Sequence, residues 1–178
     1  MNADPDVPEA AAPASAPTRF GRLPLSSRQI WTVQSPLLGF DALRQFALIA
    51  VAGQQPFLWL QALEDPSVAF LLVPAAHFGL EYPGLARPRD VLVMVLLPGR
   101  PGEDLRSHRQ APLIFDAARG EFLQSVFEDG EVQGNGRFRP VAAGGAAEVT
   151  AALVERLVMV APVASDAGSD SSGAERAA

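Results

Sequence analysis

Residues 57–73 read FLWLQALEDPSVAFLLV and contain two apolar runs joined by a short polar segment. Asp65 followed by Pro66 is a combination favoured at the first two positions of a type I turn. Apolar runs of this length on either side of a turn are typical of β-strands. We therefore predict a β-hairpin whose strands are residues 57–63 and 68–73.

Residues 57–63 are apolar on both faces of the predicted strand, because side chains alternate between the two faces. One face carries Leu58, Leu60 and Ala62, and the other carries Phe57, Trp59, Gln61 and Leu63. Such a strand is either buried on both sides or exposes an apolar patch. In the second case, Phe57 and Trp59 would help to form a contact surface for a protein partner, as aromatic anchors often do.

Similar short runs recur through the middle of the chain, separated by turn-forming residues. The additional predicted strands are residues 19–25, 29–33, 46–51, 91–97, 112–116 and 121–127. The run at 91–97 is apolar on both faces, as in a central strand, and ends at the sequence PGRPG, which no strand can cross. Seven or eight short strands at this spacing predict an all-β fold, a small antiparallel β-barrel or sandwich.

The formal net charge of the chain is −6, and all of this net negative charge lies in its two ends. Residues 1–18 contain three acidic and no basic residues, and residues 142–178 contain five acidic and two basic ones. Residues 19–141 hold twelve of each. The outermost segments lack the large apolar side chains that offset the entropy lost on ordering. We predict a disordered N-terminal tail (1–18), a β-barrel domain (19–141) and a C-terminal extension (142–178) with a disordered end.

One part of the extension, residues 147–159, shows helical periodicity. The positions that share one face of this helix are Val149, Ala152, Leu153 and Leu157. Apolar residues at this spacing predict a short amphipathic helix. Two interpretations remain open: the helix packs on the barrel, or it is a partner-binding segment that becomes ordered on contact.

The composition argues against several classes of function. All fourteen basic residues are arginine, and no basic stripe is present, so direct binding to nucleic acid is not expected. Without cysteine, the chain has no thiol nucleophile or thiolate metal site. The longest apolar run has seven residues, far short of the roughly twenty needed to span a bilayer. The N-terminus lacks the pattern of a secretory signal. We expect a cytoplasmic protein without membrane contact.

Residues suited to catalysis are few. The two histidines, His77 and His108, have no second histidine or carboxylate at a spacing typical of metal ligands. Phosphate-binding loops, dinucleotide fingerprints and nucleophile elbows are absent. The carboxylates Glu64 and Asp65 are adjacent, but the predicted turn already accounts for Asp65. We therefore expect no enzymatic activity, no cofactor and no metal.

The hairpin segment resembles a known family. Residues 56–70, PFLWLQALEDPSVAF, followed by Pro74, are similar to the flagellar assembly factor FliW. Further similar segments are TRFG at 18–21, LGFD at 38–41, FALI at 46–49, DVLVMVL at 90–96, APLIFD at 111–116 and RG at 119–120. The resemblance covers about residues 18–130. The segment between Pro74 and Asp90 is shorter than in the family pattern, and the C-terminal extension lies outside it.

The resemblance implies a small β-barrel protein without enzymatic activity. FliW proteins bind flagellin, and they bind the translational regulator CsrA and block its action on messenger RNA. Both proteins are therefore the expected partners, bound by protein–protein contact. The candidate contact residues on the hairpin are Phe57, Trp59, Gln61, Glu64 and Asp65. The alternative is a small-ligand-binding β-barrel protein without a flagellar role, which would need a pocket lined in part by polar groups.

Overall fold

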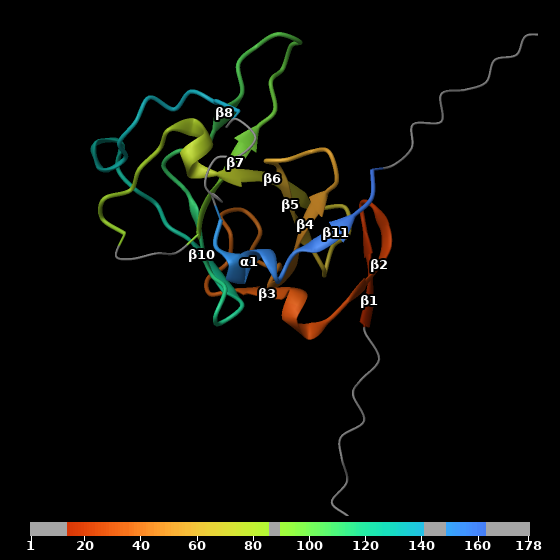
Figure 1. Cartoon of the computed structure of the whole chain (residues 1–178). Coiled ribbons are helices and arrows are strands. Elements are labelled where there is room, and N and C mark those ends of the chain that lie inside the picture. Colours follow the sequence, from red (N-terminus) through yellow and green to blue (C-terminus); the bar gives the residue numbers. More distant parts are fainter. Residues whose placement is uncertain (1–13, 86–89, 141–148, 163–178) are drawn as a thin grey trace, which may run out of the picture.

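The computed structural model describes residues 14–85, 90–140 and 149–162, and its strands form a closed barrel (Figure 1). The barrel strands are β3 (Ile30–Val33), β4 (Gln45–Val51), β5 (Leu58–Ala62), β6 (Ala69–Pro74), β7 (Asp90–Leu96), β9 (Leu113–Asp116) and β10 (Glu121–Gln124). Their hydrogen-bonded order is β4-β3-β10-β9-β7-β6-β5, and pairing of β5 with β4 closes the ring. Around this ring only β3 and β10 pair in parallel. The predicted all-β barrel is confirmed.

Short elements connect the barrel strands. Strand β8 (Arg106–Ser107) pairs with the end of β7, beyond the part of β7 that pairs with β9. Three single-turn 3₁₀ helices are η1 (Ser27–Gln29), η2 (Ala75–Phe78) and η3 (Asp129–Glu131). None of the helices in the described part of the chain is long and apolar enough to cross a membrane.

The predicted hairpin forms around Asp65. Strands β5 and β6 are antiparallel, with Gln61 opposite Ala69. The Asp65 backbone carbonyl accepts a hydrogen bond from the Val68 backbone N–H (3.1 Å), and its carboxylate accepts one from the Ser67 hydroxyl (2.6 Å). Side chain and backbone thus close the turn together, as the Asp-Pro-Ser sequence predicts.

The N-terminal boundary of the ordered fold differs from the prediction. Strand β1 (Ala14–Thr18) lies within the segment predicted to be disordered and pairs with β2 (Gly21–Leu25), Ala16 opposite Leu23. The β1–β2 hairpin lies beside β4 and β11 (Figure 1), where Ala16 and Leu23 pack against the outer face of the barrel. Backbone pairing and this contact supply the stabilisation that the composition of β1 alone does not. Residues 1–13 lie outside the described residues.

The helix predicted over residues 147–159 is also wrong in its extent. Helix α1 (Ala151–Val154) is followed by strand β11 (Val158–Val160), which pairs in parallel with β4 beyond the part of β4 that pairs with β3. A Val-Met-Val segment favours a strand when an edge is available to it, and β4 provides that edge. Residues 147 and 148 lie outside the described residues, and so do residues 163–178, which contain the predicted disordered end.

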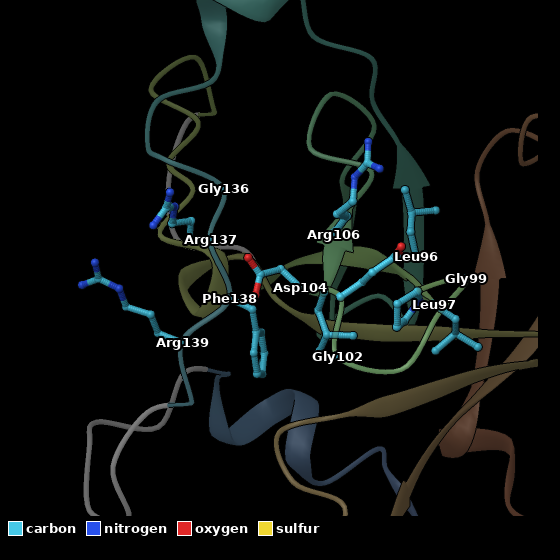
Figure 2. Close-up of a pocket in the computed structure, with 13 residues that line it drawn as sticks. Leu96, Leu97, Gly99, Gly102, Asp104, Arg106, Gly136, Arg137, Phe138 and Arg139 are labelled. Carbon is cyan, nitrogen blue, oxygen red and sulfur yellow. The ribbon is translucent and has the colours of Figure 1, made fainter.

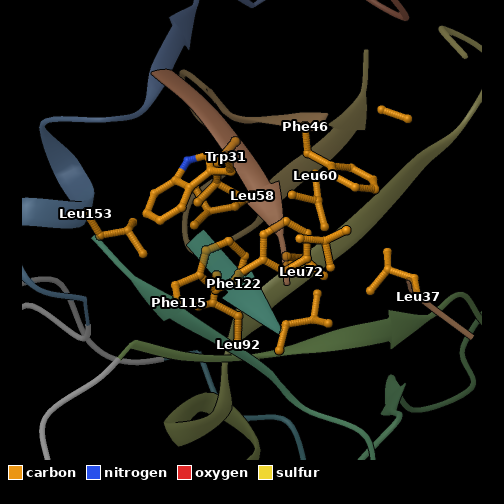
Figure 3. Packing of buried hydrophobic residues seen from close by; sticks show 14 of the residues in the cluster. Trp31, Leu37, Phe46, Leu58, Leu60, Leu72, Leu92, Phe115, Phe122 and Leu153 are labelled. Atoms are coloured by element: carbon orange, nitrogen blue, oxygen red, sulfur yellow. The ribbon is translucent and has the colours of Figure 1, made fainter. Parts of the chain in front are cut away.

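The barrel interior is filled by packed side chains, shown in Figure 3. Trp31 contacts Phe115 edge to face at 5.0 Å, and Phe46 contacts Phe122 at 5.3 Å between ring centroids. Figure 3 shows Leu153 of α1 beside Trp31 at one end of this cluster and Leu37 at the other. Further apolar clusters cover the outer faces of β4 and β5 and of β6 and β7, which explains why these strands are apolar on both faces.

Candidate partner-binding surface

The structure separates the five predicted contact residues into different environments. Gln61 is fully buried. Its side-chain carbonyl accepts a hydrogen bond from the Arg19 backbone N–H (3.0 Å), and its amide donates to the Pro66 carbonyl (3.1 Å). Gln61 therefore ties the N-terminal hairpin to the β5–β6 turn, and its side chain is not available to a partner.

The two carboxylates of the β5–β6 turn are engaged within the fold. Glu64 is exposed, and one of its oxygens accepts hydrogen bonds from the backbone N–H groups of Arg44 (3.0 Å) and Gln45 (2.8 Å). The hydrogen bond from the Ser67 hydroxyl, with that from the Ser67 backbone N–H, lowers the pKa of Asp65. Both residues lie at the surface, where their first role is to hold local backbone.

The aromatic residues Phe57 and Trp59 are half-buried and do not form one patch. Phe57 stacks on Phe138, with the ring centroids 5.6 Å apart. Trp59 packs against the turn of the N-terminal hairpin. The Arg19 guanidinium is 4.0 Å from the Trp59 ring centroid, and Phe20 contacts the Trp59 ring edge to face. Of the two interpretations of this strand, the structure supports burial on both sides.

An exposed apolar surface is found at a groove of about 460 Å³, which Trp59 alone of the five predicted contact residues lines. The described residues include seven exposed large apolar side chains, and four of these line the groove: Leu38, Phe40, Leu96 and Leu97. Leu38 and Leu97 are 68% and 70% exposed, and Phe40 contacts Phe70 edge to face at 4.9 Å. We call this surface, with Leu38, Phe40, Phe70, Leu96 and Leu97, the apolar groove.

A larger open cavity of about 1280 Å³ adjoins the apolar groove, and Leu96 and Leu97 line both. The side of this cavity opposite the two leucines is formed by residues 136–139 (Figure 2). Three exposed arginines, Arg106, Arg137 and Arg139, line this cavity, and none forms an ion pair within the described part of the chain. We call these three residues the arginine rim.

The arginine rim is a charged border and not a site for a single anion. Figure 2 shows Arg106 on one side of the cavity and Arg137 and Arg139 on the other, with no common point to which the guanidinium groups converge. Gly134 anchors the segment that carries Arg137 and Arg139. Its φ is 108°, and its α-carbon faces the Gly79 carbonyl oxygen so closely that a β-carbon at this position would overlap that oxygen.

The sequence contained a signal for the groove that the strand-by-strand interpretation missed. Leu96 and Leu97 end the long apolar run immediately before PGRPG, so strand pairing stops while apolar side chains continue. Leu38 and Phe40 lie in a loop. Leu96 is the last residue of β7 and pairs with Arg106, whereas Leu97 and Leu38 lie outside the strands, where no paired strand covers them. Within the described residues, no group of three or more histidine or acidic side chains could hold a metal ion.

Comparison with known proteins defines the family. A family model described as FliW protein matches residues 15–135. The chain belongs to the FliW family. It is 30% identical over 110 residues to the flagellar assembly factor FliW of Leptospira interrogans, covering 54% of this chain and 73% of that protein. It is 31% identical over 124 residues to the FliW of Syntrophus aciditrophicus, covering 63% and 78%.

A solved structure shares the fold. The crystal structure of a flagellar assembly factor FliW superposes with a TM-score of 0.57 at 18% identity, over 71% of this chain and 98% of that one. The FliW match ends at residue 135 and therefore contains all four exposed side chains of the apolar groove. Helix α1 and strand β11 lie beyond it. These two elements therefore lie outside the residues that the FliW family model matches.

Proposed function

We propose that this protein is a flagellar assembly factor that binds flagellin and antagonises the translational regulator CsrA by protein–protein contact. The observation that carries this proposal is the FliW match over residues 15–135, together with relatives named flagellar assembly factors. The apolar groove supports it, because contiguous exposed apolar side chains usually mark an interaction site. Antagonism of a translational regulator would take place in the cytoplasm, and it requires no catalytic group.

Two routes lead from contact with CsrA to loss of RNA binding. If the contact lies away from the RNA surface, the antagonism is a coupling between two sites on CsrA. Alternatively, the acidic ends of this chain, each with a net charge of −3, repel RNA phosphates nearby. The second route depends on unscreened charge and therefore weakens as salt is added.

The test uses purified flagellin, CsrA and a CsrA-binding RNA. Isothermal titration calorimetry measures binding of each protein, and a gel-shift assay measures whether this chain releases the RNA. We expect both proteins to bind, RNA to be released, and added flagellin to restore the CsrA–RNA complex. Repeating the release at about 0.15 M and about 0.5 M salt separates the two routes. Binding of neither protein would overturn the proposal.

The alternative, a small-ligand-binding barrel, has no supporting observation in the described structure. Its interior is occupied by aromatic and aliphatic side chains such as Trp31, Phe46 and Leu60, all fully buried. The apolar groove and the arginine-lined cavity both lie at the surface and include exposed side chains. Protein contact is therefore the function that this geometry supports best.

A further inference from the structure

We infer that the apolar groove and the arginine rim together bind one amphipathic segment of a protein partner, whose bulky apolar side chains enter the groove and whose acidic side chains face the rim. This inference deepens the proposed function, because it states where a partner binds and what chemistry that partner presents. It rests on three observations: exposure, continuity and charge.

Exposure is concentrated at the groove. Four of the seven exposed large apolar side chains among the described residues line it, although it is a small part of the surface. Phe40 and Phe70 hold each other edge to face, which gives the groove a rigid aromatic side. Leu38 and Leu97 are each more than two-thirds exposed, so a partner that covers them removes most of their apolar side-chain area from water. The apolar face of a peptide segment provides that burial.

The two surfaces are continuous. Leu96 and Leu97 line the apolar groove on one side and the arginine-lined cavity on the other. Leu96 is the last residue of β7 and Leu97 follows it, and β8 begins at Arg106 after the intervening loop. A segment that covers these two leucines therefore extends from apolar contacts to the neighbourhood of Arg106 without leaving the surface. One occupant can engage both surfaces.

The charges of this surface select an acidic occupant. Arg19 and His108 line the apolar groove, and its lining includes no carboxylate. The adjoining cavity has three arginines against two acids, Glu103 and Asp104. Residues 19–141 as a whole carry equal numbers of acidic and basic residues. Positive charge is thus in excess where the apolar side chains are exposed, and complementary charge fixes the orientation of a bound segment and speeds its association.

The probe is a fluorescein-labelled synthetic peptide of about 18 residues, with leucine on one helical face and glutamate on the other. Two matched peptides replace glutamate by lysine or leucine by serine. Fluorescence anisotropy with the full chain measures the dissociation constants. We expect the leucine–glutamate peptide to bind at least about tenfold more tightly than either matched peptide.

Variants locate the binding surface. Leu38→Asp, and the double variant Arg137→Glu with Arg139→Glu, should each weaken binding of the leucine–glutamate peptide by about tenfold or more. The double variant should also bind the leucine–lysine peptide more tightly than the native chain does. The matched controls are Val126→Asp and Arg22→Glu, which change exposed residues outside both cavities and should bind as the native chain does. Circular dichroism checks that each variant is folded.

The same variants are then titrated with purified flagellin and CsrA, which distinguishes this inference from the proposed function. If the native chain binds either protein and the groove and rim variants bind it equally well, the inference is wrong and the proposed function stands. If the native chain binds neither protein but binds the peptide as described, the proposed function fails and the inference stands. Failure to bind any of these probes, or a preference for the leucine–lysine peptide, overturns the inference.

Discussion

The two ends of the barrel core differ in what covers them. At one end, Leu153 of α1 is fully buried beside Trp31, and the Arg156 guanidinium is 5.4 Å from the Trp31 ring centroid. The Asp90 carboxylate accepts hydrogen bonds from the backbone N–H and the hydroxyl of Thr150, both at 2.7 Å. At the other end, Leu37 is buried, whereas Leu38, the next residue, is 68% exposed.

This contrast shows that residue type does not decide the role of an apolar side chain. Leu153 and Leu38 are both leucines near the end of the same core. The chain covers Leu153 with its own extension, so that leucine contributes to stability. No segment of the described chain covers Leu38, which is therefore available to a partner. Three predictions test the contrast, beginning with the largest expected effect, and a fourth tests the β5–β6 turn.

Leu153→Ala should lower the free energy of unfolding by about 2–5 kcal/mol, because it leaves a cavity beside Trp31. Urea denaturation measures this change. The neighbouring Val154→Ala is the control: Val154 is 49% exposed, and its truncation should change stability by no more than about 0.5 kcal/mol. Equal effects of the two substitutions would show that α1 does not contribute to the core.

Thr150→Ala should cost about 1–3 kcal/mol, because it removes the hydroxyl that donates to Asp90 and caps α1 by accepting from the Leu153 backbone N–H. Thr150→Ser keeps the hydroxyl and should restore most of the stability. Thermal unfolding of the two variants gives the comparison. If serine is no better than alanine, the hydroxyl does not hold the extension to β7.

Leu38→Ser, at the opposite end, should change the free energy of unfolding by less than about 0.5 kcal/mol, because Leu38 is mostly in water in the folded state. Binding of the leucine–glutamate peptide should nevertheless weaken. Denaturation and anisotropy on the same preparation measure both quantities. A loss of stability like that of Leu153→Ala would contradict the distinction between the two ends.

Asp65→Asn should have the smallest effect on stability and a defined dependence on pH. The folded-state pKa of Asp65 is lowered by its hydrogen bonds from Ser67, so the ionised carboxylate stabilises the fold above its usual pKa of 3.8. This stabilisation is lost as the pH falls through the lowered pKa. The small difference in Tm between the native chain and the variant at neutral pH should therefore disappear in acid. A difference that persists there would mean that ionisation is not its cause.

Local pattern was sufficient to predict much of the fold. The alternation of apolar runs with turn residues predicted the barrel strands, and Asp65-Pro66 predicted the β5–β6 hairpin. These features depend on neighbours in the sequence: a strand needs a run of suitable residues, and a tight turn needs residues that adopt its backbone angles. The FliW resemblance was carried by the same local strings and is confirmed by the match over residues 15–135.

Tertiary contacts decided the remainder. Strand β1 and strand β11 have sequences that a local pattern does not identify, and they become strands because β2 and β4 offer edges to pair with. Gln61 is a polar residue in β5, and only the fold shows that it is fully buried, with its side-chain amide hydrogen-bonded to the backbone of Arg19 and Pro66. The groove arises because Leu38 and Leu97, 59 positions apart, meet at one surface. Local sequence determined most of the barrel strands, while the closed barrel determined the strands β1 and β11 and which apolar side chains are covered, because edge pairing and coverage depend on residues that are distant along the chain.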